Sequence, residues 1–200
     1  PTGMETDSPV TITGISGEAS EMERVTLTID MLSDNANHVG DGGGLPALID
    51  GKVNTYYHTK WNAPVTTEAH YVQIKLNKPL KDLCFEYDAR QSGVNNGGDV
   101  KAATIYGSMN GEFFESMGNE EFNLPTTNGG HATAKNNVSG KQAYNYIRFT
   151  PTARRDKDPL DYTVAGSAWW NMSEIYLYRI RHDEAWAREQ RLTKNKIRSD

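Results

Sequence analysis

Apolar and polar residues alternate along several short segments in the middle of the chain. The alternation is strict over residues 72–76 and recurs over 83–87. A period of two residues is typical of strands that bury one face. The same pattern predicts further strands over residues 25–29, 102–106, 144–149 and 172–178. Many short strands, with no long helical pattern between them, predict an all-β fold, an antiparallel β-sandwich of the jelly-roll kind.

Turn-forming residues separate these segments. Asn110 and Gly111 stand between two apolar runs, which predicts a hairpin with a type I′ turn because both residues tolerate positive φ. Residues 33–45 and 124–141 are predicted as long loops, and loops longer than about 12–15 residues are commonly functional. The loops of a sandwich gather at its ends, so we expect a binding site there, with Asn35 and His38 at its edge.

The two ends of the chain differ from the middle. Residues 1–20 are rich in Gly, Ser, Thr and Glu, and we interpret them as a linker or the end of a preceding domain. Residues 21–180 are assigned to the sandwich. In residues 181–200 acids precede bases, as the helix dipole favours, which predicts a C-terminal helix that connects to a following domain. Other domains of the same polypeptide are therefore expected partners.

Composition and charge exclude some classes of function. The 200 residues, with 36% hydrophobic and 24% charged, are typical of one globular domain. The net charge of −5 lacks the basic excess that phosphate binding needs, so no nucleic-acid partner is expected. No run approaches the roughly 20 apolar residues of a membrane span. The single cysteine, Cys84, excludes an internal disulfide and leaves the compartment open.

Three segments carry a family resemblance. Residues 47–58 have the sequence ALIDGKVNTYYH, residues 87–97 have YDARQSGVNNG, and residues 173–178 have SEIYLY. In this order and spacing they resemble the discoidin family, also called coagulation factor 5/8 type C, which overlaps the family-32 carbohydrate-binding modules. The resemblance implies a galactose-binding-like sandwich from a bacterial glycan-handling protein. It also implies a secreted or cell-surface location, as an outer-membrane lipoprotein or in the periplasm.

The resemblance implies a sugar site on neighbouring loops. A sugar presents hydroxyl groups and one more apolar face, so its site needs planar hydrogen-bonding groups beside an aromatic surface. Family-32 galactose binders use a His, an Arg and an Asn for this purpose. The matching candidates here, with the aromatic residues, are His58, Arg90, Asn95, Asn96, Trp61, Trp169 and Trp170. Which asparagine and which tryptophan face the ligand stays open, although only one of two adjacent tryptophans faces the site if the segment is extended.

A second implied site is a structural calcium ion. The turn around Asp50 and Gly51 is rich in oxygen atoms, which suit a hard cation. The family resemblance implies that the ligands are carbonyl groups near Ala47, Asp50, Lys52 and Thr55, with help from Glu174. Lys52 stands where the family often has Asn, which does no harm if the backbone carbonyl is the ligand. The alternative is a glycine-stabilised turn without an ion.

No recognised catalytic motif accompanies these residues. The G-x-S-x-G and H-E-x-x-H patterns are absent, and Cys84 has no catalytic context. We therefore expect a non-catalytic, lectin-like carbohydrate-binding module that targets a larger secreted or surface protein to glycans, a galactose-type sugar being favoured. The alternative is a structural or protein-interaction sandwich without sugar binding. Phospholipid binding, a third hypothesis, needs apolar and basic loop tips, whereas these are rich in Asn, Gly and Thr.

Overall fold

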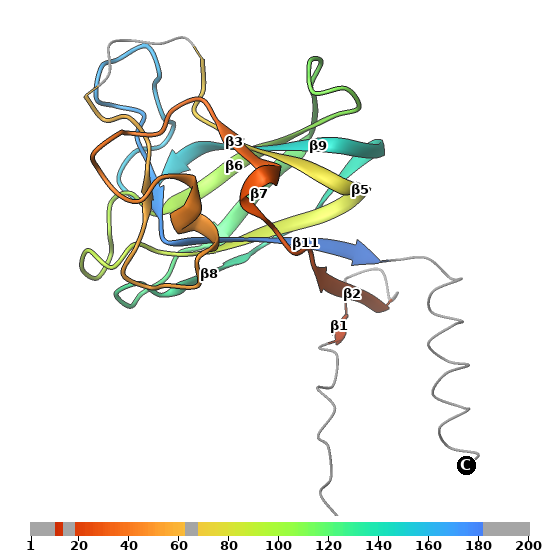
Figure 1. Ribbon diagram of the computed structural model, residues 1–200. Helices are drawn as coiled ribbons and strands as arrows, with labels where there is room; N and C mark the ends of the chain where they lie inside the picture. Colours follow the sequence, from red (N-terminus) through yellow and green to blue (C-terminus); the bar gives the residue numbers. More distant parts are fainter. Residues whose placement is uncertain (1–10, 14–18, 63–67, 182–200) are drawn as a thin grey trace, which may run out of the picture.

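The computed structural model describes residues 11–13, 19–62 and 68–181, which form an antiparallel β-sandwich (Figure 1). The elements are β1 (Thr11–Thr13), β2 (Ala19–Arg24), η1 (Ile29–Met31), β3 (Leu32–Asp34), η2 (Leu45–Ile49), β4 (Tyr57–His58), β5 (Val72–Asp88), β6 (Val100–Ser108), β7 (Glu115–Asn123), β8 (His131–Ala134), β9 (Val138–Arg154), β10 (Asn171–Met172) and β11 (Glu174–Arg181). η1 and η2 are 3₁₀ helices. Within these residues, no helix has the length and apolar character to cross a membrane.

One nine-stranded sheet forms the body of the molecule. Its order is β1-β2-β11-β5-β8-β7-β6-β9, and β3 pairs with β5. The long strand β5 also pairs with β9, Val72 lying opposite Phe149 and Leu83 opposite Val138, so the sheet closes on itself. Register shifts on either side of Leu80 interrupt this ladder, as expected where a strand bends. The first part of β5 pairs with β3, whereas its last part pairs with β11 and β8.

The predicted alternation is present in the strands and supplies the core. In β5, Val72 and Ile74 are buried while Lys75 is exposed. The largest fully buried side chains are Trp170, Tyr57, Tyr87, Tyr144, Phe85, Phe122 and Phe149. Phe85 packs on Phe149 with ring centres 5.0 Å apart. Burial of each large apolar side chain contributes about 1.5–3 kcal/mol, so these rings supply much of the stability.

The strand predicted over residues 25–29 is not formed. β2 ends at Arg24, and the backbone N–H of Val25 donates the last hydrogen bond toward Leu177 of β11. Beyond it the chain enters η1, where Ile29 is 49% exposed. Alternation alone did not reveal that the chain leaves the edge of the sheet here, although β11 continues past this point to Glu174. The other predicted strands lie within β5, β6, β9, β10 and β11.

The predicted hairpin is confirmed, but its turn type is wrong. β6 and β7 pair antiparallel, joined by residues 109–114. Gly111 has a φ of 79°, whereas Asn110 is not among the described residues with positive φ. The Asn110 side chain instead accepts hydrogen bonds from the backbone N–H groups of Glu112 and Phe113. Asparagine thus uses its side chain to make the turn, which competes with the type I′ conformation.

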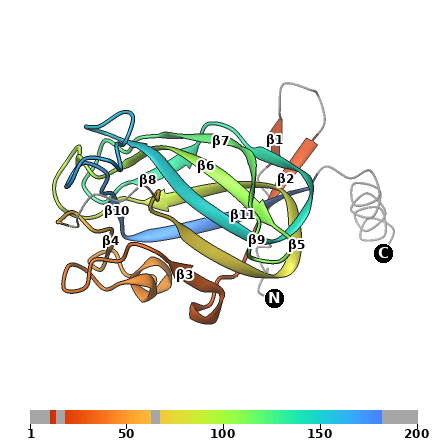
Figure 2. The ribbon, with the colours of Figure 1, turned by 90° about the horizontal axis from the view of Figure 1, so that it is seen from above.

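The segment 124–141 is not one long loop, because it contains β8 and the start of β9. β8 pairs with β5, Ala132 lying opposite Tyr87. Strand β1 falls within residues 1–20 and pairs with β2, which extends the edge of the sheet at β11. The predicted C-terminal helix lies outside the described residues. Figure 2 shows β4 and β10 at one end of the sandwich and β1 and β2 at the other.

Candidate functional site

The candidate site lies at the end of the sandwich that carries β4 and β10 (Figure 2). These two strands pair, with His58 opposite Asn171. The chain that follows β5 and the chain that follows β9 are joined at this end, because the N–H of Arg155 donates to the carbonyl of Asp99 at 2.8 Å. The N–H of Asn171 also donates to the carbonyl of Gly98, at 3.3 Å. Segments far apart in sequence are thereby brought together.

Asp41 organises one half of this site. Its carboxylate accepts hydrogen bonds from Tyr56 Oη and from Trp61 Nε1, each at 2.7 Å. The Tyr56 hydrogen bond, aided by the positive charge of Arg90, holds the pKa of Asp41 below its usual value against the effect of burial. Asp41 reaches Tyr56 because Gly42 has a φ of +91°, and a Cβ there would lie 2.5 Å from the carbonyl oxygen of Tyr56.

Arg90 and Trp61 lie near this carboxylate, Arg90 half-buried and Trp61 exposed. The Arg90 guanidinium lies 3.7 Å from the centre of the Tyr56 ring, and it makes no hydrogen bond to any residue in the described ranges. Its donors are therefore free for a ligand. Trp61 is 45% exposed, and one face of its indole stacks on His38 at 5.0 Å and 9°. The stacking on His38 and the hydrogen bond to Asp41 thus fix the orientation of the indole, while much of its surface remains exposed.

His58 and Trp169 form the other half of the site. The imidazole stacks on the Trp169 indole, with ring centres 5.4 Å apart. His58 Nδ1 lies 2.6 Å from the carbonyl oxygen of Thr59. Burial lowers the pKa of His58, so the ring is neutral at pH 7. The guanidinium of Arg154 also lies against the Trp169 ring, 4.0 Å from its centre. Trp169 is thus packed against protein groups to a greater extent than Trp61.

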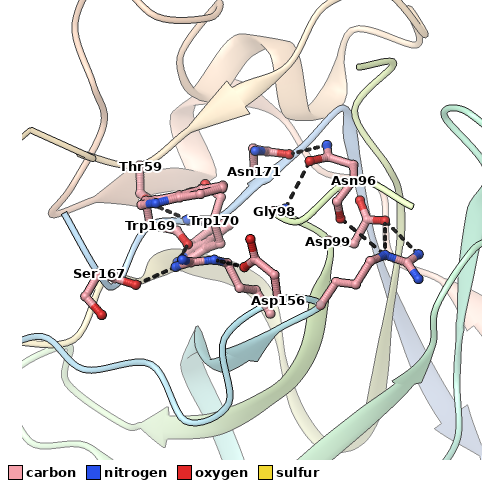
Figure 3. Close-up of polar contacts among 11 residues, drawn as sticks. Thr59, Asn96, Gly98, Asp99, Asp156, Ser167, Trp169, Trp170 and Asn171 are labelled. Atoms are coloured by element: carbon pink, nitrogen blue, oxygen red, sulfur yellow. Dashed lines mark hydrogen bonds and ion pairs between the residues drawn. The ribbon is translucent and has the colours of Figure 1, made fainter. Parts of the chain in front are cut away.

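The two adjacent asparagines have different surroundings. Asn96 uses both ends of its amide, donating to Asn171 Oδ1 at 3.0 Å and accepting from the N–H of Gly98 at 3.0 Å (Figure 3). Asn95 is exposed and has a φ of 58°, in the left-handed region that asparagine tolerates. Its side chain bonds to no residue in the described ranges. Of the two amides, that of Asn95 is the one available to a ligand.

The two adjacent tryptophans point to opposite sides, as extended backbone requires. Trp170 is fully buried, packing on Tyr57 at 5.4 Å and on Phe149 at 6.0 Å. Its backbone N–H donates to Thr59 Oγ1 at 2.9 Å (Figure 3). Trp170 is therefore a core residue and lies outside the site. The structure brings together His58, Arg90, Trp61 and Trp169, it leaves Asn95 exposed beside Asn96 in the chain, and it gives Asn96 a hydrogen bond to Asn171.

The residues implied as calcium ligands gather at a second position beside η2. Glu174 Oε1 accepts from the N–H of Gly51 at 2.6 Å. Asp50 accepts from Thr55 Oγ1 at 2.7 Å and from the N–H of Lys52 at 2.9 Å. Ala47 is buried within η2. Glu174 is only 4% exposed, and burial together with the neighbouring Asp50 raises its pKa to about 7.

This donor set fits a hard cation. Two carboxyl groups approach each other where one of them is buried, and a cation between them would offset their repulsion. No group of three or more His, Cys, Asp or Glu side chains suited to a metal occurs in the described part of the chain. An ion here would therefore depend on backbone carbonyl and hydroxyl oxygens as well, which calcium accepts.

Sequence reasoning missed Asp41 and Tyr56, and it missed Arg154 and Arg155, described below. Asp41 stands in the glycine-rich stretch 40–44, which we expect from motifs alone to be no more than a flexible loop. An acid placed between glycines was the available signal, because such a loop can bring a carboxylate close to another backbone. For the two arginines, no local pattern indicates their partners.

The fold and the loop-end position of these residues define a β-sandwich of the galactose-binding-like class. The model of the F5/8 type C domain matches residues 33–174, and the chain belongs to this family. Among curated proteins, none matches this chain.

Several solved structures share the fold. The C-terminal domain of a chitobiase from Bacteroides fragilis has a TM-score of 0.51 and 18% identity, covering 80% of this chain and 99% of that one. CBM32-3 from a family 31 glycoside hydrolase of Clostridium perfringens has a TM-score of 0.50 and 19% identity, covering 75% and 92%. CBM32-1 and CBM32-2 of ZmpB from Clostridium perfringens, in complex with GalNAc, have a TM-score of 0.50 and 15% identity, covering 80% and 39%.

Proposed function

We propose that this chain is a non-catalytic carbohydrate-binding module that attaches a larger protein to glycans, a galactose-type sugar being favoured. The observation that carries the proposal is the arrangement at the loop end. A half-exposed indole, Trp61, donates to Asp41, and the Arg90 guanidinium, which stacks on Tyr56 and makes no hydrogen bond in the described ranges, lies near the same carboxylate. His58 and Asn95 add a neutral imidazole and a free amide. These groups match the hydroxyls and the apolar face of a pyranose.

The roles follow from the chemistry of each group. Trp61 would stack on the apolar face of the sugar, and Arg90 would donate two hydrogen bonds to ring hydroxyls through its fork. Asn95 would donate and accept, and His58 would accept or donate through Nε2, since Nδ1 faces the Thr59 carbonyl. Such a shallow site with few anchors gives an expected Kd of about 10 μM to 1 mM.

The surroundings of the module are part of the same proposal. Relatives in the fold include modules of a glycoside hydrolase and of ZmpB, the latter solved with GalNAc. We propose by analogy that this module stands beside other domains in a bacterial protein that is secreted or at the cell surface. A calcium ion held by Asp50, Glu174 and nearby carbonyls would tie η2 to the start of β11 and so stabilise the loop end.

A glycan array probed in calcium, followed by calorimetry on any hit, tests the proposal. Arg90→Ala is the informative variant, because the Arg90 guanidinium makes no hydrogen bond to a described residue and its loss leaves no buried polar partner. Arg179→Ala is the matched control, since Arg179 is on β11 and donates to the carbonyl of Pro79 at 3.0 Å. We expect binding to be lost in Arg90→Ala and kept in Arg179→Ala. A folded, calcium-loaded protein that binds nothing on a broad array would favour a protein-interaction domain.

A further inference from the structure

β9 ends at Arg154, the next residue is Arg155, and the two arginines reach different loops. Arg154 is 6% exposed, and the Arg155 side chain is 20% exposed. Their partners, several of which are labelled in Figure 3, are mainly backbone carbonyls and carboxylates of the loops at the site. We call Arg154 and Arg155 together the arginine clamp.

Arg154 holds the loop that carries Trp169. Its Nη1 donates to the carbonyl oxygens of Ser167 and Trp169, the latter at 2.9 Å. Its Nε bonds to Asp156 Oδ1 at 2.6 Å, and its guanidinium lies 4.0 Å from the centre of the Trp169 ring. Trp169 in turn stacks on His58. One buried cation thus fixes both the backbone and the ring of Trp169 and, through that ring, the imidazole of the site.

Arg155 holds the loop that carries Asn95. It donates to Asp99 Oδ2 through Nε and Nη2, at 3.2 and 2.9 Å, and Asp99 is 1% exposed. Further bonds reach the carbonyl oxygens of Asn96, at 3.3 Å, and Pro125. These contacts fix the backbone on the C-terminal side of Asn95. An asparagine in the left-handed region would otherwise have several conformations open to it.

The two halves of the clamp are coupled through Asp156. This residue is the carboxylate partner of Arg154, and it also lies against the loop that Arg155 holds. A Cβ added to Gly97 would be 2.5 Å from Asp156 Oδ2, so the two loops are in direct contact there. The hydrogen bond between the side-chain amides of Asn96 and Asn171 forms a second connection between the loops.

We propose that the arginine clamp positions the two ligand loops, setting the separation between the His58–Trp169 half and the Asn95 loop. The proposal rests on the proposed function, since it treats these loops as the sugar site. A site with few anchors keeps its affinity only if its loops are ordered before binding, because ordering during binding reduces the net free energy. The clamp residues act through Trp169, His58 and Asn95, and they are positioning residues.

Lysine substitutions test the clamp with little risk to folding. Arg154→Lys and Arg155→Lys keep a positive charge beside Asp156 and Asp99, so no buried carboxylate is left unpaired. They remove the planar fork and the stacking on Trp169. The matched control is Arg148→Lys, on the same strand. The Arg148 guanidinium also lies over aromatic rings, and its described contacts are with Tyr71, Phe114 and Gln73.

Three readouts separate positioning from general stability: glycan affinity by calorimetry, the melting temperature, and hydrogen exchange of residues 93–99 and 165–170. We expect both clamp variants to weaken binding about tenfold relative to Arg148→Lys, with similar melting temperatures in all three. Exchange in the loops should be faster in the clamp variants and return to the wild-type rate at saturating glycan. The proposed role of the clamp is overturned if the clamp variants bind as tightly as Arg148→Lys, or if their loops exchange at the wild-type rate. Wild-type protein that binds no glycan overturns the proposed function instead, and loop exchange alone then decides whether the clamp orders these loops.

Discussion

Glu120 of β7 is entirely buried, and its replacement has a calculable effect on stability. Its Oε1 accepts a hydrogen bond from the backbone N–H of Phe85 at 2.6 Å, whereas Oε2 has no partner within the described structure. Burial raises the pKa of Glu120 to about 9, against the effect of the Phe85 bond. The carboxyl group is therefore protonated at neutral pH. The Glu120 carboxyl group contacts β5 between Leu83, which pairs with β9, and Tyr87, which pairs with β8.

The magnitude follows from the two pKa values, about 9 in the folded protein and 4.5 in the unfolded chain. A raised pKa in the folded state contributes stability that is complete below pH 4.5 and declines as the pH rises toward 9. The slope is about 1.4 kcal/mol per pH unit, or about 3 kcal/mol between pH 5.5 and 7.5. Glu120→Gln keeps an acceptor for Phe85 and cannot ionise. The free energy of unfolding of Glu120→Gln, minus that of the wild type, should therefore increase by about 3 kcal/mol from pH 5.5 to pH 7.5.

Urea denaturation at pH 5.5, 6.5 and 7.5 measures this difference. Glu121→Gln is the control, because Glu121 is the next residue on the same strand, is exposed, and undergoes the same chemical substitution. We expect the Glu121→Gln and wild-type curves to shift together with pH. If the free energy of Glu120→Gln also runs parallel to that of wild type, Glu120 is not a buried neutral carboxyl and the reasoning is refuted.

Three further predictions concern the site and its supports. Trp61→Ala should weaken glycan binding by about tenfold or more in calorimetry, because it removes the exposed aromatic surface; unchanged affinity would exclude Trp61 as the platform. Calcium should raise the melting temperature of the wild type and not that of Glu174→Gln, and an equal rise in both would exclude Glu174 as a ligand. Burial opposes protonation of His131, but hydrogen bonds to Glu86 and Asp88 raise its pKa overall. The stability that protonated His131 gains from these two carboxylates should therefore be present below about pH 6.5 and decline as the pH rises through the raised pKa. An NMR titration midpoint of His131 below 6.5 would contradict this.

Local patterns were sufficient for most of the fold. Alternation over residues 72–76 places Val72 and Ile74 in the core because side chains of a strand point alternately to its two faces. The same rule separates Trp169 from Trp170, although it does not say which of them is buried. Patterns failed where tertiary contacts decide the outcome: the chain leaves the sheet after Val25 although β11 continues, and Asn110 makes its turn through its side chain.

By itself, the sequence determined the class of fold, and the family resemblance predicted the residue types of the candidate site, His58, Arg90 and an asparagine. Tertiary structure alone decided which candidates are available to a ligand. The Asn96 amide is bound to Asn171 while Asn95 is exposed, and a hydrogen bond to Asp41 orients the exposed Trp61. The physical reason is that alternation acts between near neighbours in the chain. The availability of a side chain depends instead on partners far away in sequence, which come within hydrogen-bond distance only when the sheet closes.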